Sequence, residues 1–212
     1  MNRETITVNG REYTLHHSSV KIGVKDLTDR YRDVEKFITY CKACNRYNAC
    51  WSCPPFDFDA DAYLAAYQTA HIIGTKIILD KETIDSHQGW DNCTKISYEI
   101  IGTVRKELDN TLLSKEAQYL ESKAFFAGTC RLCPAGQCTK ITGTPCISPE
   151  KIRPSLEALG FNVSDISLEL LNIEMKWSRN GILPEYFTLV SGFFDPYPIT
   201  QSDNLVKSIF PL

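Results

Sequence analysis

HIIGTKIIL, residues 71–79, is the longest run of aliphatic side chains in this sequence. The run is far too short to span a bilayer, and its composition predicts a strand buried in the protein interior. Upstream, residues 4–17 alternate in polarity around Asn9 and Gly10, which predicts a hairpin. PEYFTLVSGFF, residues 184–194, predicts a further strand near the end of the chain.

Helical patterns fall between these strands. They predict helices over residues 25–41, 57–70, 93–112 and 148–163, the last with Gly160 as its C-cap. A loop is predicted over residues 80–92 and a strand over residues 117–128. Because strands and helices mix through the whole length, we expect an α/β or α+β fold with a mixed sheet, in a single compact domain over residues 1–212. Cysteine-rich segments at 41–55 and 128–150 are expected in its loops, and the second could form a small ferredoxin-like lobe.

Composition narrows the class of protein. With 212 residues, of which 43% are hydrophobic, the chain can build a core without cross-links. A net charge of −3 gives no electrostatic attraction to nucleic acid or to anionic membranes. The opening MNRETITVNGREY has no apolar signal region, so we expect a cytoplasmic protein with reduced thiols.

The nine cysteines are the strongest functional signal. Eight of them form two quartets, spaced C-x2-C-x5-C-x2-C and C-x2-C-x4-C-x7-C: Cys41, Cys44, Cys50, Cys53, and Cys130, Cys133, Cys138, Cys146. Disulfides are disfavoured in a reduced compartment, and catalytic thiol exchange needs only one pair. Metal ligation by all eight thiols is therefore predicted. Cys93 stands alone and is expected to be a buried apolar residue.

Spacing also bears on which metal is bound. Zinc knuckles are usually separated by a dozen or more residues, and the gap inside the first quartet is five. Short mixed loops and prolines after a ligand are more typical of iron–sulfur sites, so one or two four-iron (4Fe-4S) clusters are predicted, with zinc as the alternative. Nearby cations would offset the negative charge of a cluster: Lys42, Arg46, Arg131 and Lys140.

The motifs CKACNRYNACWSCPP, residues 41–55, and AGTCRLCPAGQC with the later RPSLEALGFNV resemble the domain of unknown function 2284 family. The likeness covers roughly residues 30–195. It implies a cysteine-ligated metal or iron–sulfur centre in a cytoplasmic prokaryotic protein, without a known reaction. Cys50 departs from the family pattern.

Cys50 decides between three arrangements. Without Cys50, the first set supplies three thiolates and leaves one iron open, as in catalytic sites. With Cys50, both quartets are closed, which favours electron transfer or a structural role. In the third arrangement ligands are mixed between the sets, as in two-cluster ferredoxins. The sequence leaves all three open.

The predicted function is that of a 4Fe-4S metal-binding protein in redox chemistry or electron transfer to a partner protein. The alternative is a structural four-cysteine zinc protein with a partner-binding role. The sequence identifies no catalytic residue and no oligomeric state. Several other residues could contribute to a functional site, but capping, packing or a place on the surface would explain them as well. These residues are Asp57, Asp59, Asp61, His16, His17, His71, His87, Trp90, Asp91, Arg153 and Ser155.

Overall fold

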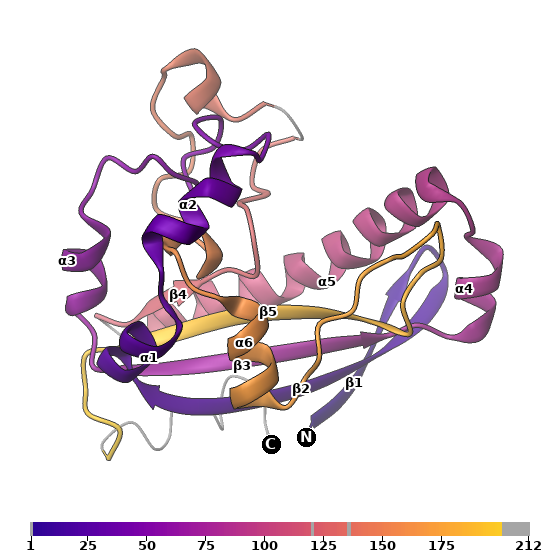
Figure 1. Cartoon of the computed structure of the whole chain (residues 1–212), viewed down its shortest axis with the longest axis horizontal. Coiled ribbons are helices and arrows are strands. Elements are labelled where there is room, and N and C mark those ends of the chain that lie inside the picture. Colours follow the sequence, from indigo (N-terminus) through magenta and orange to yellow (C-terminus); the bar gives the residue numbers. More distant parts are fainter. Residues whose placement is uncertain (1, 120, 135–136, 201–212) are drawn as a thin grey trace.

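The structure is a computed structural model that describes residues 2–119, 121–134 and 137–200. Its centre is an antiparallel sheet with the strand order β1-β2-β3-β5-β4 (Figure 1). The strands are β1 (Asn2–Val8), β2 (Arg11–Gly23), β3 (Thr69–Ile78), β4 (Lys123–Phe125) and β5 (Tyr186–Asp195). Helices and loops pack on both faces of this sheet, which confirms an α+β fold. The prediction of a mixed sheet was wrong, because all four pairs of neighbouring strands in the described structure are antiparallel.

The predicted hairpin is confirmed. β1 and β2 pair from Val8 opposite Arg11, so Asn9 and Gly10 form the turn between them. Their φ angles are 52° and 80°. A two-residue hairpin turn of the favoured hand needs positive φ at both positions, which asparagine and glycine adopt most easily.

The aliphatic run at 71–79 forms most of the central strand, β3. Its alternate side chains enter two separate cores. Ile73 and Ile77 face the core built with the long helix α5 (Trp90–Gln118), and Ile72 faces the core on the other side of the sheet. A glycine at position 74 leaves room for Leu171, because a Cβ there would lie 2.8 Å from Leu171 Cδ1. Burial of β3 on both faces explains its continuous hydrophobic run.

The helix predicted over residues 25–41 is two helices. α1 (Val24–Tyr31) ends at Arg32, which is extended, and α2 (Val34–Lys42) begins after Asp33. The Asp33 side chain accepts a hydrogen bond from the Lys36 backbone N–H at 2.9 Å. This N-cap starts a new helix and changes its direction, although the apolar spacing continues through the break.

Other boundaries differ from prediction more modestly. Residues 80–92 contain the short helix α4 (Lys81–Ser86), capped by Asp80, where a loop was predicted. α3 (Ala60–Ala65) is shorter than expected, and α5 continues through Gln118, so only β4 remains of the strand predicted over 117–128. Near Gly160, whose φ is 92°, the helix is reduced to the 3-10 turn η2 (Glu157–Leu159). The sequence did not predict α6 (Val163–Asp165) and the π-helical turn η3 (Ile166–Leu170).

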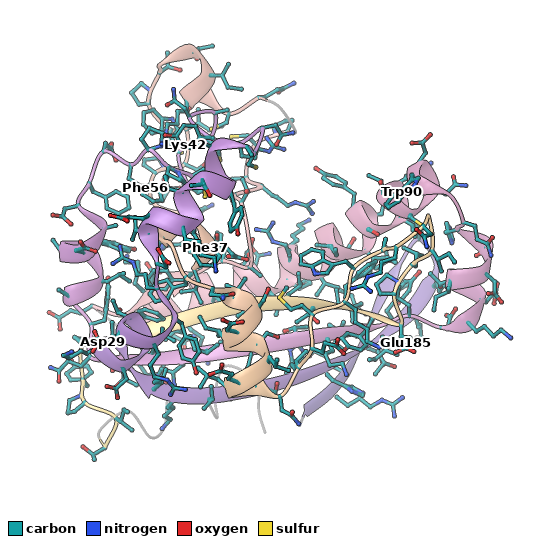
Figure 2. The ribbon with its side chains drawn as sticks, in the orientation of Figure 1. Asp29, Phe37, Lys42, Phe56, Trp90 and Glu185 are labelled. Carbon is teal, nitrogen blue, oxygen red and sulfur yellow. The ribbon has the colours of Figure 1, made fainter. Side chains whose placement is uncertain are left out.

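The two cysteine-rich segments project together away from the sheet, next to the end of α2 (Figure 1). Lys42 lies in this projecting part, whereas Trp90 is at the distant end of α5 (Figure 2). Of the residues described between Cys130 and Glu150, none belongs to either hydrophobic core. No helix in the described part of the chain has the length and apolar character needed to cross a membrane.

Candidate metal centre

The first cysteine segment folds as consecutive tight turns. The Cys44 backbone N–H donates to the Cys41 carbonyl at 3.0 Å, and the Cys53 N–H donates to the Cys50 carbonyl at 3.0 Å. Each C-x2-C pair thus forms its own turn. The backbone N–H of Arg46 approaches Cys44 Sγ at 3.5 Å, an arrangement that stabilises a thiolate or a metal-bound sulfur.

Side chains of both segments make hydrogen bonds that hold the two segments together. Trp51 Nε1 donates to the Thr144 carbonyl at 3.2 Å. Lys140 Nζ donates to the carbonyls of Cys53 and Pro55, at 3.1 and 2.7 Å. The two segments, far apart in sequence, therefore form one structural unit, which also includes the 3-10 turn η1 (Thr139–Thr142).

Ser52 lies where the two segments meet. Its hydroxyl is buried and accepts a hydrogen bond from the Cys130 backbone N–H at 3.0 Å. The same oxygen lies 3.3 Å from Cys50 Sγ and 4.0 Å from Cys53 Sγ. Since the oxygen only accepts in the bond from Cys130, the hydroxyl proton stays available for a sulfur acceptor.

One cavity, of about 230 Å³, is lined by three thiols of the first quartet. These are Cys41, Cys44 and Cys53. Thr129 and Glu157 line the same space, and Thr129 Oγ1 lies 3.6 Å from Cys53 Sγ. Cys50 is not part of this lining.

Cys50 instead faces the second quartet. It lines a smaller cavity, of about 60 Å³, together with Cys130, Cys133 and Cys138. Its thiol also interacts with those of Cys53 and Cys138. The eight cysteines are therefore not divided as their order in the sequence suggests, because Cys50 lies at the junction and shares its cavity with the second set.

Cys146 lies at the edge of this arrangement. It acts electrostatically on Cys130 and Cys133, so it belongs to the same neighbourhood. Its Sγ receives the Ser148 backbone N–H at 3.5 Å. Cys146 also lines a third cavity, of about 500 Å³, whose walls include the rings of Trp51 and Tyr63.

Burial controls the protonation of several thiols. It raises the pKa of Cys130 to about 11, and it also raises the pKa values of Cys41 and Cys133. A hydrogen bond from the Cys53 thiol, helped by Ser52, lowers the pKa of Cys50, and the same bond raises the pKa of Cys53. Metal binding must therefore displace protons from most of these sulfurs.

The four expected cations lie near the thiols in different ways. Arg131 stacks on Tyr98 with its Cζ 4.2 Å from the ring centroid, and both line the smaller cavity. The Arg131 guanidinium also lies against α5, where a Cβ at Gly102 would be 2.7 Å from Nη1 and the arginine would have to shift. Arg46 lines both thiol cavities, Lys140 bridges the segments as described above, and Lys42 is exposed.

Sequence reasoning missed a fifth cation, Arg105. Its side chain is buried on α5, and Nη2 donates to the carbonyls of Gly128 and Thr129 at 3.1 and 2.7 Å. It fixes the chain immediately before Cys130 and acts electrostatically on Cys130 and Glu157. An arginine beside the apolar stripe of a predicted helix was a detectable signal, because such a charge needs buried partners. Ser52 and Glu157 gave no comparable signal.

Several other candidates have structural roles. Asp59 caps α3, and Asp61 pairs with Arg32. The side chains of His71 and Asp195 are bonded at 2.8 Å inside the sheet, and His17 bonds Glu4 and Thr75.

Arg153 pairs with Glu116 instead of lying free at a helix end. Asp57 is exposed beside the largest cavity. The Cys93 thiol is buried and donates to the His87 and Gly181 carbonyls at 3.1 and 3.2 Å.

The thiols surround cavities and do not converge on one point. Within residues 2–119, 121–134 and 137–200, no group of three or more His, Cys, Asp or Glu side chains is already close enough to hold a single metal ion. The donor set nevertheless suits a thiophilic metal, since soft sulfur ligands, backbone amides and nearby cations occur together.

Fold and site define a class: an α+β protein in which two cysteine-rich segments are carried together at one side of an antiparallel sheet. Residues 28–191 match the family model described as predicted metal-binding protein (DUF2284), so the chain belongs to this family. No curated protein and no solved structure matches the chain. Metal binding is the function that the family description supports.

Proposed function

We propose that this chain is an iron–sulfur protein that transfers single electrons to a partner protein in the cytoplasm. The observation that carries the proposal is the cavity of about 230 Å³ lined by Cys41, Cys44 and Cys53. A single zinc ion, with thiolates at about 2.3 Å, needs no such space between its ligands. A four-iron cluster is larger than a single ion, and three cysteines around such a space would hold three of its irons.

The second site would be built from Cys50, Cys130, Cys133 and Cys138, with Cys146 close by. This is the third of the arrangements that the sequence left open, in which the ligands of one site come from both cysteine motifs. Cys50 would then serve the second site although it lies in the first motif. A second four-iron cluster is the primary assignment for this group.

Zinc remains the alternative at the second site, for a specific reason. The cavity between its four thiols has a volume of only about 60 Å³, which suits four thiolates around one ion. A protein with a cluster at the first site and a structural zinc at the second would also fit the donors. In that case the second site stabilises the projecting segments and presents them to a partner.

A bound iron–sulfur cluster supplies reversible one-electron transfer. The chain's own groups set the conditions for it. The backbone N–H groups of Arg46 and Ser148 donate to the sulfurs of Cys44 and Cys146, and the Ser52 hydroxyl lies within hydrogen-bond distance of Cys50 Sγ. Arg105 and Arg131 place positive charge beside Cys130. Such groups stabilise the reduced, more negative state and raise the reduction potential.

The test is elemental analysis of anaerobically purified protein together with its visible spectrum. Eight irons with matching sulfide would support two clusters, and four irons beside one zinc would support the mixed arrangement. In either case the colour should bleach with dithionite. Two zincs without sulfide would overturn the redox proposal and leave a structural, partner-binding zinc protein.

A further inference from the structure

The carboxyl group of Glu157 is the most unusual polar group near the thiols. Glu157 opens the 3-10 turn η2, which packs against α2, the helix that ends at the first cysteines. Its Oε2 atom is buried and has no hydrogen-bond partner among the described residues. Leaving a buried carboxyl oxygen without a partner destabilises the folded state. Such an atom requires an explanation in terms of something it binds.

Glu157 lines the same cavity as the three thiols of the first site. Cys41, Cys44 and Cys53 line it, and Glu157 lines it as well, together with Ser155 and Ala158. The carboxylate acts electrostatically on the Cys41 thiol, so the two groups are close. The cavity therefore combines three soft ligands with one oxygen ligand.

A nearby cation does not satisfy this carboxylate. Arg105 acts on Glu157 electrostatically, but its Nη2 is bonded to the carbonyls of Gly128 and Thr129. Arg105 Nε has no partner in the described structure either, so no hydrogen bond joins the two groups. Burial raises the pKa of Glu157, and Arg105 opposes that rise only in part, so a metal bound by this carboxyl group would have to displace its proton.

We propose that the Glu157 carboxylate is the fourth protein ligand of the metal centre held by Cys41, Cys44 and Cys53. This inference rests on the proposed function, because it needs a metal in that cavity. Three cysteines leave one metal position without sulfur, and Glu157 is the donor that shares the cavity with them. An oxygen ligand binds iron less tightly than a thiolate does, so this position would exchange with added ligands more readily than a cysteine-bound one.

The experiment compares four anaerobically loaded proteins: the native chain, Glu157→Gln, Glu157→Cys and the control Glu150→Gln, which alters an exposed glutamate of the second segment. Iron per chain is measured against time in a chelator, and the electron paramagnetic resonance spectrum is recorded after reduction. We expect Glu157→Gln to lose iron about 10-fold faster than the native chain, since metal sites that lose an anchoring group weaken by about 10–100-fold. Glu157→Cys should retain iron with a changed spectrum, and Glu150→Gln should match the native chain.

Two further measurements keep the result interpretable. The thermal unfolding of the metal-free proteins shows whether Glu157→Gln folds, and we expect a stability close to that of the native chain because the amide has nearly the same shape as the carboxyl group and carries no buried charge. Cys41→Ala tests the site itself. If Cys41→Ala loses iron but both Glu157 variants match the native chain in iron loss and spectrum, the Glu157 inference is overturned and the proposed function stands. If Cys41→Ala also keeps its full iron, the proposed function fails at this cavity.

Discussion

The backbone N–H of Cys130 donates to Ser52 Oγ at 3.0 Å, and this bond joins the two cysteine segments. The two residues are 78 positions apart in the sequence. Ser52 also lies between Cys50 and Cys53 and close to both sulfurs. One buried hydroxyl thus contacts thiols that line different cavities.

Ser52→Ala should therefore weaken both sites. We expect the free energy of unfolding to fall by about 1–2 kcal/mol, because the Cys130 N–H loses its acceptor. Metal should also dissociate faster into a chelator. Urea unfolding and timed metal release measure the two effects. Ser97→Ala is the control, because that hydroxyl donates to the Cys93 carbonyl in the preceding turn of α5; equal effects in the two variants would contradict the role given to Ser52.

Cys50→Ala should remove metal from the second site and spare the first. Cys93→Ala is a matched control, because both thiols are buried, with 3% and 2% of their surface exposed. We expect Cys93→Ala to keep the full metal content and Cys50→Ala to behave like Cys133→Ala, which should lose metal and solubility together. Metal analysis of the three variants decides this. The double variant Cys41→Ala, Cys50→Ala separates the two sites. If it loses no more metal than Cys41→Ala alone, Cys50 belongs to the first site.

Glu116→Gln should be the most destabilising change away from the cysteines. Glu116 pairs with Arg153 and Lys123 and accepts the Ala124 N–H, so it joins α5 to β4 and to the chain after Cys146. Removing one charge from a buried pair costs about 3–5 kcal/mol. Thermal or urea unfolding measures the loss, with the exposed Glu107→Gln as control. A loss below about 1 kcal/mol would mean that the pair is effectively solvated.

The same residue predicts a pH dependence. Burial opposes ionisation of Glu116, but hydrogen bonds from Arg153 and Lys123 outweigh it and hold the pKa of Glu116 below its ordinary value of 4.5. The folded chain therefore binds this proton less tightly than the unfolded chain. Its contribution to stability is present above pH 4.5 and is lost as the pH falls through the lower, folded pKa. Glu116→Gln should remove this part of the acid sensitivity in a series of unfolding curves.

Asp109 should make the stability depend on pH in the opposite sense to Glu116. Burial raises the pKa of Asp109 from 3.8 to about 6, although Arg105 lies 3.7 Å away. The folded chain then holds this proton more tightly than the unfolded chain does. Its stabilising contribution is complete below pH 3.8 and is lost as the pH rises through about 6. Asp109→Asn should flatten the stability profile between these values, and an unchanged profile would show that Asp109 ionises normally.

Removing the metal should leave the sheet intact. The described residues between Cys130 and Glu150 add nothing to either hydrophobic core, whereas β3 and α5 supply many core residues. We expect hydrogen exchange in the metal-free protein to accelerate in residues 41–58 and 129–150 and to stay slow in β3. Global loss of protection would mean that metal binding and folding of the sheet form one cooperative transition.

Local signals in the sequence were enough to predict most of the sheet. Asn9 and Gly10 fixed the hairpin, and the continuous aliphatic run identified the central strand, because both features depend only on neighbouring residues. The break before α2 was missed since hydrophobic spacing continues across Asp33, whose capping bond outweighs it. A capping residue can end one helix and start another within a continuous hydrophobic pattern. A prediction based on hydrophobic periodicity over a long window does not detect such a break.

The grouping of thiols could not be predicted from spacing. Cys50 lies three residues from Cys53, but side chains on one turn can point to different cavities, and only the tertiary placement of Cys130 and Cys138 shows which one Cys50 faces. The role of Glu157 likewise depends on how η2 packs against α2. The role of Arg105 was also missed, although the sequence does show its charge beside the hydrophobic stripe of the helix.

The turn closed by the Cys53 N–H and the Cys50 carbonyl is shared by both candidate sites. Occupation of one site orders the backbone that carries a ligand of the other. The two sites are then thermodynamically linked: filling the first raises the affinity of the second by some factor, and filling the second raises the affinity of the first by the same factor. A variant that cannot fill the second site, such as Cys50→Ala, should accordingly keep the metal of the first site but hold it less tightly than the native chain does.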